Sequence, residues 1–121
     1  MTNETQKQNE RSNLESHLIA RLEGRKQIGG APFISSKNVL ENFMIRGVLE
    51  SKLNQVKPAI TDYFKPMNLQ VGKTLSGDMS IYDGPTERFW LTITEEEDNS
   101  YESRNCKERP YELYVTLAAK Q

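Results

Sequence analysis

Two short features of the sequence contain residue types that carry out chemistry, and each lacks a neighbour that the chemistry requires. Gly72-Lys73-Thr74 matches the end of a phosphate-binding loop, but that motif needs a glycine five residues earlier, where this chain has Met67. His17 is the only histidine, and it lies beside an apolar stripe. Because a general base needs a positioned partner, we interpret His17 as a residue at the boundary of the core.

Cys106 is the only cysteine, and it stands between Arg104 and Lys107. Neighbouring cations favour the reactive thiolate, but the sequence places no histidine near it to complete a nucleophilic pair. The acidic candidates for catalysis follow no recognisable spacing; they are Asp78, Asp83 and Glu87. We therefore expect a protein that is not an enzyme and that binds no cofactor.

The densest charge in the chain is the run Glu95-Glu96-Glu97-Asp98. This run lacks the alternating ligands and the glycine of a calcium loop, so we assign no metal site. Clustered charge also steers encounters between proteins. We therefore include Glu95, Glu96, Glu97 and Asp98 among the candidate protein-binding residues.

Composition limits the class of protein. The 121 residues are enough for one domain with a modest core, which we assign to residues 12–121. Residues 1–11 contain no apolar side chain after the first Met, and we expect a disordered polar tail there. No apolar run approaches the ~20 residues that span a bilayer, and a single cysteine fits a reducing compartment. The sequence thus predicts a cytoplasmic protein without a membrane segment.

The charge is divided unevenly along the chain. Residues 1–65 carry a net charge of +3 and residues 66–121 carry −4, within a total of −1. Neither half has the strong basic excess that is typical of proteins that bind nucleic acids. We therefore rank nucleic-acid binding below protein binding among the candidate functions.

The first half of the domain, residues 12–66, has the apolar period of helices. Leu14, Leu18 and Leu22 form one stripe, which predicts a helix over 12–27 that ends before Gly29-Gly30-Ala31-Pro32. Ser35 or Ser36 would begin a longer helix, and Pro58 would break it and open a short third segment, 58–64. The longer helix has two apolar stripes: Leu40, Phe43, Met44 and Val48 on one side, and Ile45, Leu49, Leu53, Val56 and Ile60 on the other. We expect the second stripe to be covered by helix 12–27, by the sheet or by a second subunit.

The second half, residues 67–121, alternates apolar and polar residues and predicts four strands. Short connections imply antiparallel neighbours, except for a polar loop at about 95–109. The sequence therefore predicts an α+β fold in which two N-terminal helices pack on one face of a four-stranded antiparallel meander. The apolar positions that would face the helices are Phe89, Leu91, Ile93, Leu113 and Val115.

The alternation assigns the remaining strand residues to the opposite face of the sheet. That face would carry Tyr82, Trp90, Thr92, Thr94, Tyr114 and Thr116. Tryptophan and tyrosine contribute much of the energy at protein interfaces, although aromatic and β-branched residues also suit strands for packing alone. We select Tyr82, Trp90, Thr92 and Tyr114 as candidate protein-binding residues.

These observations favour a small protein-binding module, such as an adaptor, an inhibitor or an accessory subunit, of a kind common among phage and mobile-element products. One alternative is a homo-oligomeric structural protein, which would pair through Ile45, Leu49, Leu53, Val56 and Ile60 or through the sheet. The other alternative is a weak binder of single-stranded nucleic acid, in which bases would stack on the exposed rings.

Overall fold

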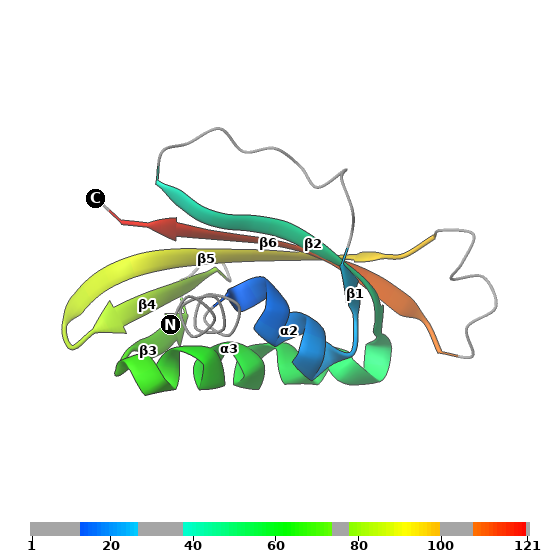
Figure 1. Ribbon diagram of the computed structural model, residues 1–121, viewed down its shortest axis with the longest axis horizontal. Coiled ribbons are helices and arrows are strands. Elements are labelled where there is room, and N and C mark those ends of the chain that lie inside the picture. Colours follow the sequence, from blue (N-terminus) through cyan, green and yellow to red (C-terminus); the bar gives the residue numbers. More distant parts are fainter. Residues whose placement is uncertain (1–12, 27–37, 74–77, 100–107, 121) are drawn as a thin grey trace, which may run out of the picture.

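The computed structural model describes residues 13–26, 38–73, 78–99 and 108–120. In these residues six strands form one antiparallel sheet in the order β1-β2-β6-β5-β4-β3, and two α-helices lie on one of its faces (Figure 1). The helices are α2 (Leu14–Leu22) and α3 (Val56–Phe64). The strands are β1 (Arg25–Lys26), β2 (Val39–Leu49), β3 (Gln70–Lys73), β4 (Met79–Asp83), β5 (Thr86–Glu97) and β6 (Pro110–Ala119). The 3₁₀ turns η1 (Glu50–Gln55) and η2 (Lys65–Met67) flank α3.

The prediction of a four-stranded sheet is wrong, because the segment predicted as the long second helix begins with β2. In β2, Phe43 and Ile45 face the core while Met44, also buried, lies on the opposite face. When the sequence of a strand with two apolar faces is placed on a helix, its apolar residues form two stripes on opposite sides. The β-branched and aromatic residues of this segment, Val39, Phe43, Ile45 and Val48, suit a strand.

The first helix is shorter than predicted and leads into another unpredicted strand. It ends at Leu22, Glu23 adopts a left-handed conformation with φ 54°, and β1 then pairs with β2. Gly24 permits this close turn, since a Cβ there would lie 2.4 Å from Cγ2 of Ile45. The predicted helix over 12–27 therefore covers both α2 and β1.

The strands of the second half agree with the predicted meander. Sheet neighbours follow chain order from β3 through β4 and β5 to β6, and β2 joins the far side of β6. The predicted third segment is α3, with Pro58 in its first turn, where a missing backbone N–H costs little. The polar loop begins later than predicted, because β5 continues to Glu97.

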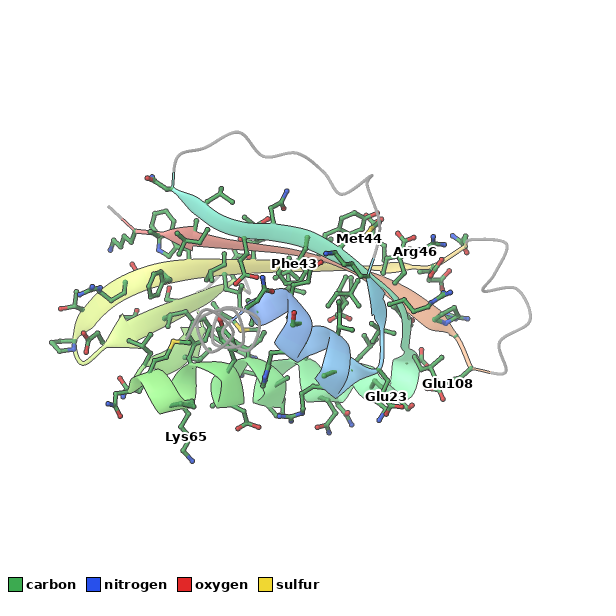
Figure 2. The ribbon with its side chains drawn as sticks, in the orientation of Figure 1. Glu23, Phe43, Met44, Arg46, Lys65 and Glu108 are labelled. Atoms are coloured by element: carbon green, nitrogen blue, oxygen red, sulfur yellow. The ribbon has the colours of Figure 1, made fainter. Side chains whose placement is uncertain are left out.

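The core fills the space between the two helices and one face of the sheet. Leu91, Leu113 and Val115 are fully buried there, and Phe89 and Ile93 pack against them, which confirms the predicted inner face. Lys65 extends from the end of α3 away from the sheet, on the solvent side of the helical layer (Figure 2). Among the described residues no helix lies over the other face of the sheet, which we call the outer face.

A carboxylate from the sheet anchors α2. The two oxygens of Glu41 on β2 accept hydrogen bonds from the backbone N–H groups of Leu14 (2.9 Å) and Glu15 (3.1 Å). Asn13 accepts the next two N–H groups, from Ser16 through its side chain and from His17 through its carbonyl. Leu14, Glu15 and Ser16, whose N–H groups have no acceptor within the helix, are therefore satisfied from outside it, and His17 makes the first internal bond of the helix.

The apolar stripe predicted for self-association does not exist as a helix face. Its residues are divided among β2, η1 and α3, and three of them, Ile45, Val56 and Ile60, are buried in the core of the chain itself. Leu49 and Leu53 are half-buried. Neither of the helices in the described segments is long and apolar enough to span a membrane.

Candidate functional site

The outer face is organised in rows that run across the central strands. The pairing of β5, β6 and β2 places Thr92, Thr116 and Asn42 in one row and Thr94, Tyr114 and Met44 in the next. Asn42 accepts a hydrogen bond from the hydroxyl of Thr116 at 3.0 Å. The two central rows of the outer face therefore carry no charged side chain.

An apolar row lies at one end of this face. Trp90 stands opposite Ala118, and Ala118 stands opposite Val39. The register shifts between Val39 and Glu41, and Glu41 points to the inner side, so Val39 and Leu40 both oppose Ala118 on the outer face. Trp90 is 49% exposed and Leu40 is 54% exposed. Two of the three large hydrophobic residues that are exposed in the described segments thus share one row.

The predicted aromatic residues are distributed along the face rather than gathered. Tyr114 lies two rows from Trp90, about 13 Å along the strands, with Thr92 and Thr116 between them. Its hydroxyl donates to Glu112 at 2.9 Å, and this bond, with partial desolvation, raises the pKa of Tyr114. Tyr82 covers β3, since its ring lies 3.2 Å from where a Cβ on Gly72 would be.

The four residues of the acidic run have different surroundings. Glu96 is exposed and pairs in register with Glu112 on the outer face, whereas Glu95 and Glu97 are exposed on the opposite side of the strand. Glu97 forms a 2.7 Å ion pair with Arg109. Asp98 is buried with its side chain 0% exposed, so it is not available to a partner. Of this run, only Glu96 is exposed on the face that carries Trp90.

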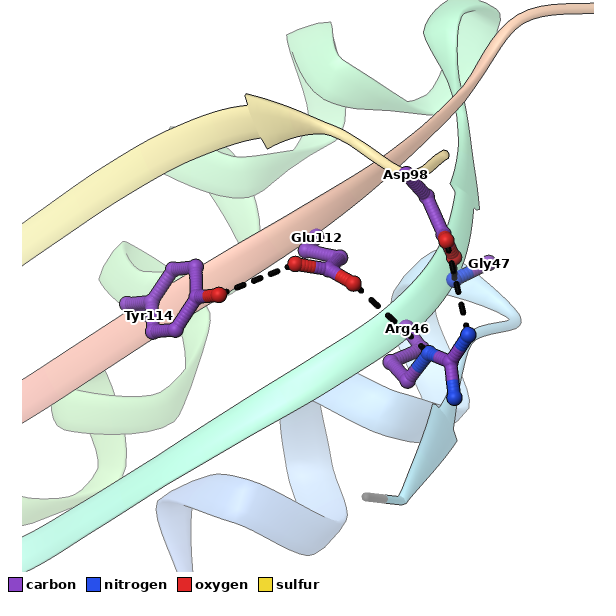
Figure 3. Close-up of polar contacts among 5 residues, drawn as sticks. All are labelled: Arg46, Gly47, Asp98, Glu112 and Tyr114. Carbon is purple, nitrogen blue, oxygen red and sulfur yellow. Dashed lines mark hydrogen bonds and ion pairs between the residues drawn. The ribbon is translucent and has the colours of Figure 1, made fainter. Parts of the chain in front are cut away.

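Asp98 belongs to a polar network that ends the outer face (Figure 3). Its carboxylate accepts a bond from the backbone N–H of Gly47 at 3.3 Å and contacts the Arg46 guanidinium at 3.5 Å. Arg46 also lies 3.7 Å from Glu112, which accepts the Tyr114 hydroxyl. The network fixes the ends of β2, β5 and β6 to one another.

A second charged pair lies beside the apolar row. The ammonium group of Lys120 lies 2.6 Å from the carboxylate of Glu87. Lys120 lowers the pKa of Glu87 most, the Ser80 hydroxyl and the Trp90 indole lower it further, and the resulting value is about 2. Glu87 is therefore an ionised structural group next to Trp90.

The residues that resembled catalytic groups form no site in the described segments. His17 contacts the carbonyl of Ala59 at 2.9 Å and the ring of Tyr63, so it joins α2 to α3. Gly72 and Lys73 lie in β3 and not before a helix, and Cys106 lies outside the described residues. No group of three or more His, Cys, Asp or Glu in those segments is placed to hold a metal ion.

Sequence reasoning identified Trp90 but missed the row that it belongs to. Val39 and Leu40 were assigned to a helix, and Ala118 was not considered because alanine carries little signal by itself. The β-branched and aromatic residues Val39, Phe43, Ile45 and Val48 were the available sign of a strand.

Comparison of the chain with protein-family models, with curated proteins and with solved structures finds no match.

Proposed function

We propose that the chain is a small cytoplasmic, non-enzymatic protein-binding module, such as an adaptor, inhibitor or accessory subunit, that binds its partner through the outer face of the sheet. The observation that supports this proposal is the exposed apolar row of Trp90, Ala118, Val39 and Leu40. A tryptophan and a leucine that are both exposed in one row of a sheet are costly in water and typical of an interaction site.

The chemistry of the face indicates what kind of partner fits. The row accepts apolar side chains, and the threonines of the next two rows offer hydroxyl groups without charge. Glu96 lies about 20 Å from Trp90 along β5. A partner surface with an apolar anchor and a basic group at this separation would complement both ends.

Self-association through the same face is the second candidate, because the same apolar row would be buried against a second copy. Light scattering coupled to size exclusion distinguishes the two, since a monomer at micromolar concentration removes the homo-oligomer. Stacking of unpaired bases has less support, because Glu87, Glu96 and Glu112 place carboxylates on the same face and would repel phosphate. An unchanged Trp90 fluorescence on titration with an oligonucleotide at low salt would exclude it.

The test compares three forms of the protein in affinity capture from the cells that produce it. Trp90→Ala combined with Leu40→Ser removes the apolar row. Met67→Ser is the matched control, because Met67 is also exposed (44%) but lies in η2, in the helical layer. We expect one stoichiometric partner with wild type and Met67→Ser, and a loss of affinity of at least tenfold with the double variant.

Each form must first unfold cooperatively with an unchanged circular dichroism spectrum, because the row lies outside the core. Equal capture of the partner by all three forms would overturn the proposal. The variant Trp90→Ala with Tyr114→Ala extends the test to the third row, where loss of cooperative unfolding would instead assign these rings to the core.

A further inference from the structure

The ion pair of Glu87 and Lys120 lies next to the apolar row, in a position set by the pairing of three strands. Glu87 on β5 pairs with Tyr82 on β4, and Trp90 pairs with Ser80 on the same strand. The register shifts between these two pairs, so Glu87 and Trp90 are three residues apart in the chain and yet share the outer face. Without that bulge, an odd spacing would place them on opposite faces.

Lys120 makes a contact through its backbone and another through its side chain, and together these contacts fix the Glu87 carboxylate. Its backbone N–H donates to the carbonyl of Arg88 at 2.9 Å, and its ammonium contacts Glu87 at 2.6 Å. The Glu87 side chain is only 18% exposed. A carboxylate with a fixed cationic partner and little exposure has few alternative positions, so both of its oxygens are rigid acceptors.

We propose that Glu87 is a positioning residue for Trp90, so that its carboxylate, held by Lys120, fixes the edge of the indole ring and leaves the ring face for the partner. This inference depends on the proposed function only for the use of the surface, since the positioning itself is a property of the free protein. In this arrangement the indole N–H, the one polar group of the side chain, bonds to Glu87, and the exposed part of Trp90 is apolar. The partner group that docks on it is therefore an apolar side chain and not a hydrogen-bond acceptor.

The lowered pKa of Glu87 agrees with this arrangement, because the Trp90 indole is among the groups that favour the ionised carboxylate. A side chain that is fixed before binding loses less conformational entropy when the partner arrives. The bulge, the ion pair and the tryptophan thus form a preformed anchor.

The test uses the fact that Trp90 is the only tryptophan, so its indole N–H gives one resonance in a nitrogen-proton correlation spectrum. Glu87→Gln and Lys120→Met are compared with wild type, and Glu97→Gln is the control, since it removes an exposed ion-paired carboxylate at the other end of β5. We expect the indole resonance to move and its exchange with solvent to become about tenfold faster in both test variants. Glu87→Asp should restore part of the protection, and Glu97→Gln should change neither quantity.

An indole resonance and exchange rate that are the same in Glu87→Gln, Lys120→Met and wild type would overturn the inference. A change of the same size in Glu97→Gln would overturn it too, because it would then reflect a loss of general stability. The spectra need no partner, so this result is independent of the capture experiment. If the indole responds as expected but no partner is captured, the positioning stands and the proposed function fails.

Discussion

The carboxylate of Asp98 and the guanidinium of Arg46 lie 3.5 Å apart where β2 bulges, and the Asp98 side chain is fully buried while Arg46 retains 21% exposure. The register of β2 on β6 shifts between Ile45 and Val48, so two residues of β2, Arg46 and Gly47, stand opposite the single residue Glu112 of β6. Asp98 contacts both of these residues. The end of an acidic run thus becomes a structural part of the sheet.

Replacing Asp98 by Asn is expected to destabilise the fold by about 3 kcal/mol. The amide keeps the size of the side chain and one acceptor oxygen, but the mostly buried Arg46 loses the closer of its two carboxylate partners and keeps only Glu112, at 3.7 Å. Urea denaturation measures the change in the free energy of unfolding.

Glu97→Gln is the control for this prediction, because the neighbouring carboxylate forms a solvent-exposed pair with Arg109. We expect a change below about 1 kcal/mol for that variant. If the two substitutions cost the same, the buried network does not stabilise the bulge in the way the contacts indicate.

Gly47→Ala is expected to cost more than Gly84→Ala. Both glycines have left-handed backbone conformations, with φ of 70° and 60°, so each alanine incurs strain of about 1–2 kcal/mol. At Gly47 the new Cβ would also lie 3.0 Å from Nε of Arg25, whereas nothing lies within 4 Å at Gly84.

Thermal unfolding followed by circular dichroism compares the two alanine variants. The additional loss in Gly47→Ala should shift its melting temperature further by several degrees, since about 1 kcal/mol corresponds to ~4–8 °C in a domain of this size. A Gly84→Ala variant that melts at or below Gly47→Ala would contradict the prediction.

The strands of the second half were predictable because their periodicity has only one interpretation. Leu91 and Ile93, and Leu113, Val115 and Leu117, occupy every second position, and these residues line the core. Short turns then left a meander as the arrangement of neighbours. The same pattern gave the exposure of Trp90.

The β2 strand could not be identified in this way because its burial does not alternate. Met44 on the outer face is buried like its neighbours Phe43 and Ile45, and the bulge at Gly47 interrupts the period. The sequence pattern therefore resembled two helical stripes. The error removed Val39 and Leu40 from the candidate site, since only a β2 strand beside β6 places them next to Ala118 and Trp90.

The acidic run shows a second limit of sequence reasoning. Four consecutive acidic residues suggested one solvated cluster, but an extended strand directs neighbours to opposite faces. Asp98 lies beyond the end of β5 and turns into the protein, where Arg46 neutralises it. Arg46, the cation that neutralises this buried carboxylate, lies 52 residues away in the chain, and no local sequence pattern indicates the pair.

Glu41→Ala is expected to destabilise the fold, and to do so more strongly in acid than at neutral pH. Burial raises the pKa of Glu41, the hydrogen bonds from Leu14 and Glu15 lower it, and the net direction is upward from 4.5. A carboxyl whose pKa is higher in the folded state stabilises the fold below its unfolded pKa, and this contribution is lost as pH rises through the folded value. The variant lacks this stabilising contribution. Its loss of folding free energy relative to wild type should therefore be larger at pH 4 than at pH 7.

The deficit at neutral pH is expected to be about 1–3 kcal/mol, because two backbone N–H groups at the start of α2 lose their acceptor. Asn13→Ala removes the acceptor of only one, that of Ser16, and should cost about 1 kcal/mol with no such pH dependence. Urea denaturation of the three proteins at both pH values measures these differences. A deficit of Glu41→Ala that shrinks in acid would mean that the two hydrogen bonds outweigh the burial of the carboxylate, and that Glu41 stabilises α2 mainly as an anion.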